Sequence, residues 1–264
     1  MSEVLPEKQE GESDMKKQHH IDLLPGEVAQ TVILSPDLDY AAQIAGHLSN
    51  SKVTAKKRQY ATYNGEWNGV PVSVTSTGIG SPGLAIAVEE LIMVGAKNFI
   101  LFGTGSILQT WMPVPSLVIS AAAVRGDGTS REYFPLEYPA VADWMTVEVM
   151  AETARRNSVQ ALTGYVRSND ALFAESIYAG KINYLKRSKP WIDAGCLATS
   201  NEAAALFTLA AVRGCRAGAL VFALSSLKRP YTSTYLPSGT VEKAFSEAVR
   251  TTLDAASALA SFNN

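Results

Sequence analysis

The sequence contains few of the residues that build disulfide frameworks or metal sites. Its 264 residues include two cysteines, Cys196 and Cys215, and three histidines, His19, His20 and His47. Each cysteine lies in an apolar stretch, which indicates buried, reduced thiols rather than a disulfide. The histidines show no metal-ligand spacing with cysteines or acids. We therefore expect no bound metal and no other cofactor.

Neither sign of charge is in excess, since 23 lysines and arginines face 25 aspartates and glutamates. This balance argues against a nucleic-acid partner, and the absence of a basic amphipathic segment argues against a membrane surface. The uncharged run 98–124 is long enough to span a bilayer, but glycines and prolines interrupt it, which favours two buried strands joined by a loop. We expect a cytoplasmic protein with a small-molecule partner.

The composition separates a short tail from one large domain. Residues 1–18 are polar, charged and aperiodic, which predicts a disordered tail, and they lack the apolar core of a secretory signal. The whole chain is 47% hydrophobic and 18% charged, which is typical of a globular protein. Because no internal repeat or low-complexity linker divides residues 19–264, we expect them to form a single domain.

Apolar runs of strand length alternate along this domain with segments of helix length. Strands are predicted at 31–35, 98–102, 116–124, 162–168, 192–198 and 217–224, and helices at 36–48, 82–94, 140–156, 201–212 and 241–261. Between Thr54 and Thr75 apolar and polar residues alternate, and Asn64-Gly65 and Asn68-Gly69 are turn signals, so antiparallel pairing is expected there. The pattern predicts an α/β fold in which helices flank both faces of a central mixed sheet.

Small polar residues follow four of the predicted strands, at the carboxyl ends where ligands bind in open α/β sheets. The four segments are Ser76–Pro82, Gly103–Ser106, Thr199–Glu202 and Ser225–Ser226. Glycine-rich turns often serve only to turn the chain, and Glu202 at a helix start could simply favour the helix dipole. However, apolar residues follow Glu202, and an idle carboxylate is costly to bury there. The residues alone leave ligand contact and helix capping both open for Glu202.

At these segments the sequence resembles the nucleoside phosphorylase superfamily, and most closely its uridine phosphorylase branch. The resemblance covers about residues 19–262 and implies the mixed-sheet fold of that family. It also implies an enzyme that cleaves the N-glycosidic bond of a nucleoside, with phosphate as co-substrate. The expected assembly is a homodimer, or a hexamer built as a trimer of dimers. The matching motifs are Ser76–Pro82 (S-T-G-I-G-x-P in the family), Ala87–Leu91, Phe134–Asp143, Ser168–Asp170 and Arg216–Gly218.

The resemblance also assigns expected roles to individual residues, although it identifies no catalytic residue. Glu202 matches the glutamate that binds the ribose hydroxyls, while His20 and Arg58 match residues donated across a dimer interface. The implied ribose-binding residues are His20, Thr104, Asn201 and Glu202. The implied phosphate-binding residues are Arg58 and Thr104. The implied base-binding residues are Gly105, Ser106, Phe173, Ser176 and Ser226.

Several positions depart from the family pattern at the phosphate site. Pro36 replaces a glycine whose backbone amide contacts phosphate, and proline has no such donor. Tyr40 and Leu101 replace two phosphate-binding arginines, each of which contributes about 1.5 to 3 kcal/mol as a charge-assisted hydrogen bond. We therefore expect phosphate to bind weakly.

The base site departs from the pattern as well. Ser176 and Tyr178 stand near the glutamine and arginine that uridine phosphorylases use, and Ser226 stands near the aspartate of purine-specific relatives. Serine cannot transfer a proton to the base at neutral pH. Three interpretations therefore stay open: a phosphorylase, a nucleoside hydrolase in which water replaces phosphate, and a nucleoside-binding relative without activity.

Overall fold

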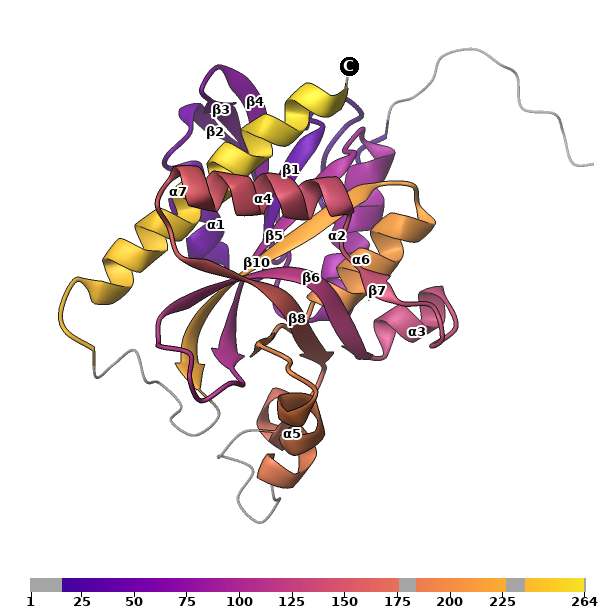
Figure 1. Cartoon of the computed structure of the whole chain (residues 1–264). Helices are drawn as coiled ribbons and strands as arrows, with labels where there is room; N and C mark the ends of the chain where they lie inside the picture. The colour runs from indigo at the N-terminus through magenta and orange to yellow at the C-terminus, as the bar shows by residue number, and fades with distance from the viewer. Residues whose placement is uncertain (1–15, 176–183, 227–235, 264) are drawn as a thin grey trace, which may run out of the picture.

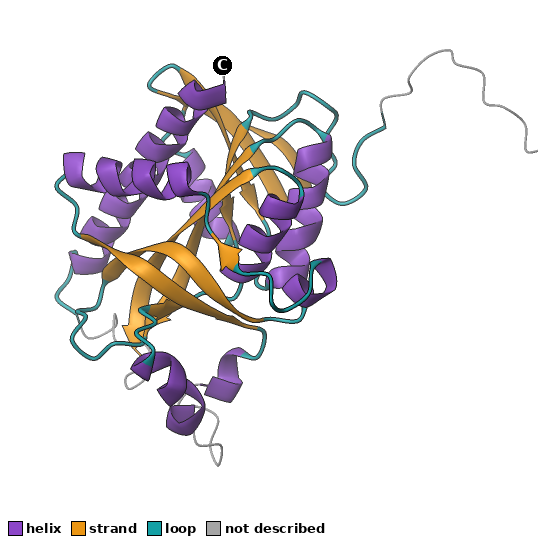
Figure 2. Cartoon of the chain, turned by 45° about the vertical axis from the view of Figure 1, so that its right-hand side comes forward, coloured by secondary structure: helices purple, strands orange, loops and turns teal. Residues whose placement is uncertain are grey.

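The computed structural model describes residues 16–175, 184–226 and 236–263. Ten strands form one mixed sheet, and helices cover both of its faces (Figures 1 and 2). The predicted α/β architecture is therefore confirmed, and the chain forms a single α/β domain. The tail expected at residues 1–18 lies outside the described residues, apart from residues 16–18.

The amino-terminal half builds one side of the sheet. Buried β1 lies between β4 and β5 and runs parallel to both, and β3 and β2 extend the sheet antiparallel from β4 to its edge. Asp37 begins the first helix because its side chain accepts hydrogen bonds from the amides of Asp39 and Tyr40. The elements are β1 (Thr31–Ser35), α1 (Leu38–Ala45), β2 (Ser49–Lys57), β3 (Tyr60–Trp67), β4 (Val70–Ser76) and α2 (Ser81–Met93).

The carboxyl-terminal half contributes the longest strands of the sheet, β6 and β10, and the longest helix, α7. Its elements are β5 (Asn98–Ile107), β6 (Ser116–Gly126), α3 (Thr129–Tyr133), β7 (Ala140–Val141), α4 (Trp144–Arg156), β8 (Ala161–Asn169), η1 (Leu172–Glu175), α5 (Tyr184–Asp193), β9 (Ala198–Thr199), α6 (Ala203–Val212), β10 (Arg216–Ser226), α7 (Thr240–Ala260) and η4 (Ser261–Asn263).

Five of these strands close into a ring. β10 pairs with both β5 and β6, β8 pairs with β6 and β9, and β9 returns to β5. Two glycines allow the strands to approach closely enough for this closure. A Cβ atom would lie 2.1 Å from the carbonyl oxygen of Thr199 at Gly105, and 2.2 Å from that of Ser168 at Gly126. Any side chain at either position would force the strands apart.

The helices pack in two groups. α2, α3 and α6 contact one another, while α4 packs against α7 (Figure 1). The residues of α6 from Ala203 to Ala210 are all buried, which fits the absence of any polar face in that helix. Asp254 of α7 ties distant elements together, since its carboxylate accepts hydrogen bonds from Trp67 Nε1 at 2.6 Å and Asn157 Nδ2 at 2.8 Å.

The segment Phe134–Asp143 has a structural role that its sequence did not reveal. Arg125 is only 7% exposed, and its guanidinium donates hydrogen bonds to the carbonyl oxygens of Ser130, Phe134, Pro135 and Tyr138. Asp143, at the end of the segment, caps α4 by accepting a hydrogen bond from the Thr146 amide. The buried guanidinium thus holds the loop between α3 and α4 in place.

Most predicted elements are confirmed, within a few residues at their ends. The uncharged run 98–124 does form two strands, β5 and β6, and no helix of the described residues is long and apolar enough to cross a membrane. The helix predicted from residue 140 begins only at Trp144, because Ala140–Val141 pairs with β6. The helix predicted to end at residue 48 ends at Ala45.

Three predictions about strands and turns were wrong. Residues 192–198 were expected to form a strand, but α5 continues to Asp193 and a turn follows, so only Ala198–Thr199 pairs as β9. Asn64-Gly65 lies inside β3 rather than at a turn. Gly103–Ser106 belongs to β5, because pairing with β10 continues to its end. In each case long-range pairing or packing overrode the local signal.

Candidate active site

The four polar segments singled out in the sequence meet at the carboxyl ends of β4, β5, β9 and β10. In Figure 1 this region lies toward the lower end of the sheet, where the arrows of β5 and β10 end. Gly80 precedes α2, and Glu202 precedes α6. The ends of strands and the beginnings of helices therefore share one region, as the general geometry of α/β sheets requires.

Hydrogen bonds connect these segments across the strands. The amide of Ser106 donates to Thr199 Oγ1 at 3.1 Å, and the hydroxyls of Ser106 and Ser225 share a hydrogen bond of 2.7 Å. Ser81 Oγ donates to the carbonyl oxygen of Asn201 at 2.8 Å. Exposed Thr104 lies two residues before Ser106 and pairs with Phe222 of β10. Thr104 and Glu202 therefore lie on the same side of the molecule.

Glu202 is the most unusual group in this region. Its side chain is only 3% exposed and accepts a hydrogen bond of 2.8 Å from the amide of Gly80. Burial raises the pKa of the carboxyl to about 7, although the Gly80 amide acts in the opposite direction. The carboxylate makes no capping hydrogen bond to α6. A capping hydrogen bond from Glu202 is therefore absent, and its carboxylate instead links the residue before α6 to the Gly80 amide before α2.

His20 lies away from Glu202 of the same chain. Its Nδ1 lies 2.6 Å from Glu90 Oε1, and its backbone amide also donates to that carboxylate. Glu90 follows Gly80 by about ten residues on α2, which corresponds to roughly 15 Å along the helix. His20 thus cannot reach the ribose position of its own chain from here. This placement fits a residue donated to a neighbouring subunit, and that role stays a prediction.

Arg58 lies in the turn between β2 and β3, with a positive φ of 55° and an exposed side chain. The adjacent Gln59 packs over Gly78, where a Cβ atom would lie 2.9 Å from Gln59 Cγ. The turn is therefore placed against the glycine loop that leads into α2. Whether Arg58 contacts phosphate, and in which subunit, stays a prediction.

Three of the five residues expected to bind the base lie on neighbouring strand ends. Gly105, Ser106 and Ser226 lie on the paired ends of β5 and β10. Phe173 lies in η1, after β8, and is 62% exposed. Ser176 lies outside the described residues. The base-binding role of all five residues stays a prediction.

Sequence reasoning gave no role to two side chains at this site, Thr199 and Arg167, although Thr199 lies in one of the four polar segments. Thr199 bonds to Ser106, as described above, and Arg167 pairs with Thr199 through the backbones of β8 and β9. The Arg167 guanidinium lies over the ring of Trp191, 4.8 Å from its centroid. An arginine within an otherwise uncharged strand, directly before Ser168, was the signal that could have identified it.

Apolar packing occupies the positions of the missing phosphate-binding arginines. Tyr40 packs against Phe245 with ring centroids 4.8 Å apart and contacts Phe102 edge-on. Burial, and secondarily the Asp37 carboxylate, raise the pKa of Tyr40. Leu101 is fully buried in the core.

Side chains of the described part of the chain form no group of three histidines, cysteines or acids that could hold a metal.

Comparison with known families agrees with this arrangement. The model of the phosphorylase superfamily matches residues 30–260, which is most of the chain. The chain belongs to the phosphorylase superfamily. The family that the motifs indicated is thereby confirmed.

Individual relatives of this phosphorylase superfamily member are similar over most of their length. A uridine phosphorylase of Thermococcus kodakarensis is 38% identical over 206 residues, covering 76% of this chain and 74% of the relative. A guanosine phosphorylase of Halorubrum lacusprofundi is 36% identical, covering 78% and 82%. The crystal structure of a uridine phosphorylase from Vibrio fischeri superimposes with a TM-score of 0.82 at 28% identity, covering 93% and 98%. These relatives favour the phosphorylase interpretation over a hydrolase or an inactive relative.

The raised pKa of Glu202 predicts how the stability of the free protein depends on pH. Between the ordinary value of 4.5 and the folded value of about 7, the folded state binds the proton more tightly than the unfolded state. The free energy of unfolding should therefore fall as pH rises through this window, by up to about 3 kcal/mol, and then level off. Glu202→Gln should abolish this contribution.

Urea denaturation of both proteins at pH 5 and pH 8 measures the effect. The quantity to compare is the difference in unfolding free energy between wild type and Glu202→Gln at each pH, because other titrating groups cancel. Wild type should lose stability relative to the variant at pH 8. An equal difference in unfolding free energy between the two proteins at pH 5 and pH 8 would contradict a buried Glu202 carboxyl that titrates near neutrality.

Proposed function

We propose that this protein is a nucleoside phosphorylase, which cleaves the N-glycosidic bond of a nucleoside with phosphate and without a further cofactor. The proposal rests mainly on the buried Glu202 carboxylate, which lies at the start of α6 and accepts a hydrogen bond from the Gly80 amide before α2. A pyrimidine nucleoside is the preferred substrate class, because Phe134–Asp143 resembles the uridine phosphorylases. A relative named guanosine phosphorylase matches at similar identity, so the proposal does not name the base.

The reaction needs the ribose held while the bond to the base lengthens and the sugar gains oxocarbenium character. In our proposal the ionised Glu202 carboxylate accepts hydrogen bonds from the ribose hydroxyls, and Asn201 and Thr104 complete the contacts to the sugar. The low exposure of Glu202 strengthens these hydrogen bonds, because few water molecules compete for the carboxylate. Phosphate would approach between Thr104 and a neighbour's Arg58.

Hydrolysis is the second candidate, and one observation favours it. Tyr40 and Leu101 are packed into the apolar interior where phosphate-binding arginines are expected. A site that lacks both guanidinium groups binds a dianion less well, and water could then take the place of phosphate. Membership in the phosphorylase superfamily nevertheless favours phosphorolysis.

Incubation with a panel of purine and pyrimidine nucleosides, with and without phosphate, tests the proposal. We expect release of free base that depends on phosphate and is lost in Glu202→Ala. Release that is equally fast without phosphate would replace the phosphorylase by a hydrolase. Intact nucleosides throughout the panel would leave only a binding function.

The altered phosphate site predicts weak binding of phosphate, with a dissociation constant in the millimolar range. Restoring Tyr40→Arg should tighten binding, since Tyr40 is only half-buried, although the variant loses the contact with Phe245. Leu101→Arg should instead unfold the protein, because it buries a guanidinium in the core. Isothermal titration with phosphate measures both affinities, and circular dichroism checks the fold. A micromolar constant for wild type would contradict the lost-site argument.

We further propose that the active unit is a homodimer, which can assemble into a hexamer, and that it works in the cytoplasm. Three exposed apolar side chains recur at seven-residue spacing along or next to α2: Ile79, Ile86 and Met93. Such a row favours burial against another subunit. It lies on the same helix that holds His20 through Glu90.

The proposed cytoplasmic location rests on the unpaired state of Cys196 and Cys215.

Donation of His20 to the neighbouring subunit predicts how dimers assembled from two different variants behave. Glu202→Gln and His20→Ala should each be nearly inactive alone. Co-expressed with different affinity tags and purified as heterodimers, they should regain about half of the wild-type activity, because one of the two sites then has every residue intact. In the matched control, His20→Ala with Arg58→Met, both sites stay defective. Failure of the first pair to regain activity would place His20 outside the neighbour's site.

A further inference from the structure

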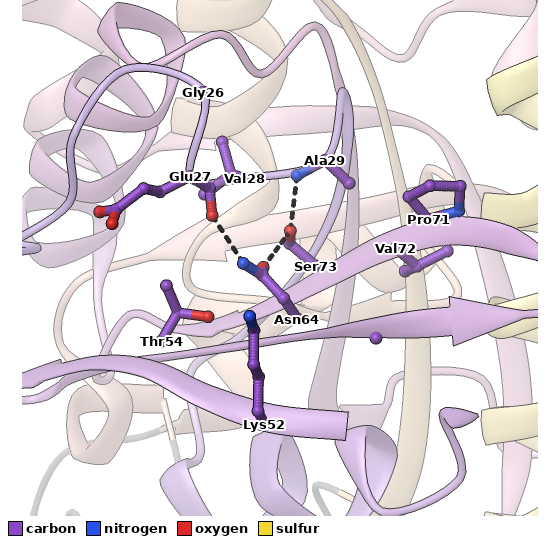
Figure 3. Close-up of a pocket in the computed structure, with 11 residues that line it drawn as sticks. Gly26, Glu27, Val28, Ala29, Lys52, Thr54, Asn64, Pro71, Val72 and Ser73 are labelled. Carbon is purple, nitrogen blue, oxygen red and sulfur yellow. Dashed lines mark hydrogen bonds between the residues drawn. The ribbon is translucent and has the colours of Figure 1, made fainter. Parts of the chain in front are cut away.

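A polar cavity lies at the opposite end of the sheet from the candidate active site. It has a volume of about 420 Å³ and is bounded by the loop before β1 and by residues of β2, β3 and β4 (Figure 3). β1 and β4 run parallel, and the cavity adjoins their amino ends, whereas Gly80 and Glu202 lie beyond the carboxyl end of β4 or at the start of α6. The two sites are therefore separate.

A relay of hydrogen bonds fixes the orientation of the Asn64 amide in this cavity. The Ala29 amide donates to Ser73 Oγ at 2.8 Å, and Ser73 Oγ donates to Asn64 Oδ1 at 2.7 Å. Because the serine hydroxyl has a single hydrogen, Asn64 must present its oxygen to Ser73 and its nitrogen to the other side. Asn64 Nδ2 donates one hydrogen to the Glu27 carbonyl oxygen at 2.6 Å. Among the described residues no acceptor takes its second hydrogen.

Two further donors extend from β2 toward the same space. Figure 3 shows the side chains of Lys52 and Thr54 directed toward Asn64 from below. The hydroxyl oxygen of Thr54 is buried and has no hydrogen-bond partner in the described part of the chain. Lys52 forms no ion pair with a described residue. A buried hydroxyl of this kind requires a partner from outside the protein, either water or a ligand.

The charge and the walls of the cavity define what could bind. Glu27 is the single acidic residue among those that line it, and its carboxylate accepts a hydrogen bond from the Leu24 amide and points away from Lys52 in Figure 3. Val28, Pro71 and Val72 add apolar surface. One ammonium group with two neutral donors matches a single negative charge, whereas a dianion would leave excess charge.

We propose that this cavity binds a small monocarboxylate, whose carboxylate lies among Lys52, Thr54 and Asn64 and whose short apolar body lies against Val28, Pro71 and Val72. This inference does not depend on the proposed phosphorylase activity, because it uses none of the residues assigned to the active site. The expected ligand is a short-chain acid, for which butyrate is a suitable probe.

Calorimetric titration of the full-length protein tests the proposal. Butyrate should bind more tightly than acetate, because its longer chain contacts the apolar wall, and inorganic phosphate should not displace it. Lys52→Met should weaken butyrate binding at least about tenfold, and Thr54→Val should weaken it by a smaller factor. Lys56→Met is the matched control, since Lys56 is an exposed lysine on the same strand that does not line the cavity.

Several outcomes would overturn the proposal. These are no butyrate binding to wild type at millimolar concentrations, wild-type affinity in Lys52→Met, an equal loss in Lys56→Met, or displacement by phosphate. The melting temperature of Thr54→Val gives an independent check. It should match wild type, because the hydroxyl has no partner within the described chain, and a large decrease would assign that hydroxyl a purely structural role. Nucleoside cleavage by Lys52→Met should stay at the wild-type rate.

Discussion

The close approach of β5 to β9 at Gly105 sets the geometry on which the candidate site depends. A hydrogen is the largest substituent that fits there, because a Cβ atom would lie 2.1 Å from the Thr199 carbonyl oxygen. This contact closes the ring of five strands and brings Thr199 within hydrogen-bonding distance of Ser106. Glu202 follows Thr199 closely in the chain. The position of the buried carboxylate is therefore a consequence of how tightly two strands can pack.

The environment of Glu202 combines two opposing requirements. Burial beside an apolar helix disfavours the ionised carboxyl, whereas hydrogen bonding favours it, first of all from the Gly80 amide. A carboxylate that must accept hydrogen bonds from sugar hydroxyls gains from the same burial, because water is excluded. The raised pKa is consistent with the ribose-binding role that we propose for Glu202.

The interior around Tyr40 and Phe102 shows what took the place of the expected cationic side chains. Four aromatic residues, Tyr40, Phe102, Phe222 and Phe245, pack with ring centroids 4.8 to 6.4 Å apart. This cluster joins α1, β5, β10 and α7, and such pairs stabilise a core beyond the area that they bury. Restoring guanidinium groups there conflicts with that packing. Apolar packing thus continues through Tyr40 and Leu101, the positions where the family pattern has arginines.

Local patterns in the sequence were sufficient for the fold class and for most elements. The buried runs at β1, β6 and β10 and the polar segments after the strands could all be read directly, because each depends on neighbouring residues. The motif Ser76–Pro82 also identified the family, and it does lead into α2 beside Glu202. Composition, periodicity and motif spacing thus determined the architecture and the general place of the site.

Only the tertiary structure decided how far strands extend and which side chains meet. β5 continues through Gly103–Ser106 because β10 offers hydrogen bonds along its length, and a local turn signal cannot report a partner more than a hundred residues away. The same reason explains the separation of His20 from Glu202 and the meeting of Arg167 with Trp191. It also explains the hydrogen bond from the Gly80 amide to the Glu202 carboxylate. These contacts arise from the closed ring of strands, whose geometry no single segment encodes.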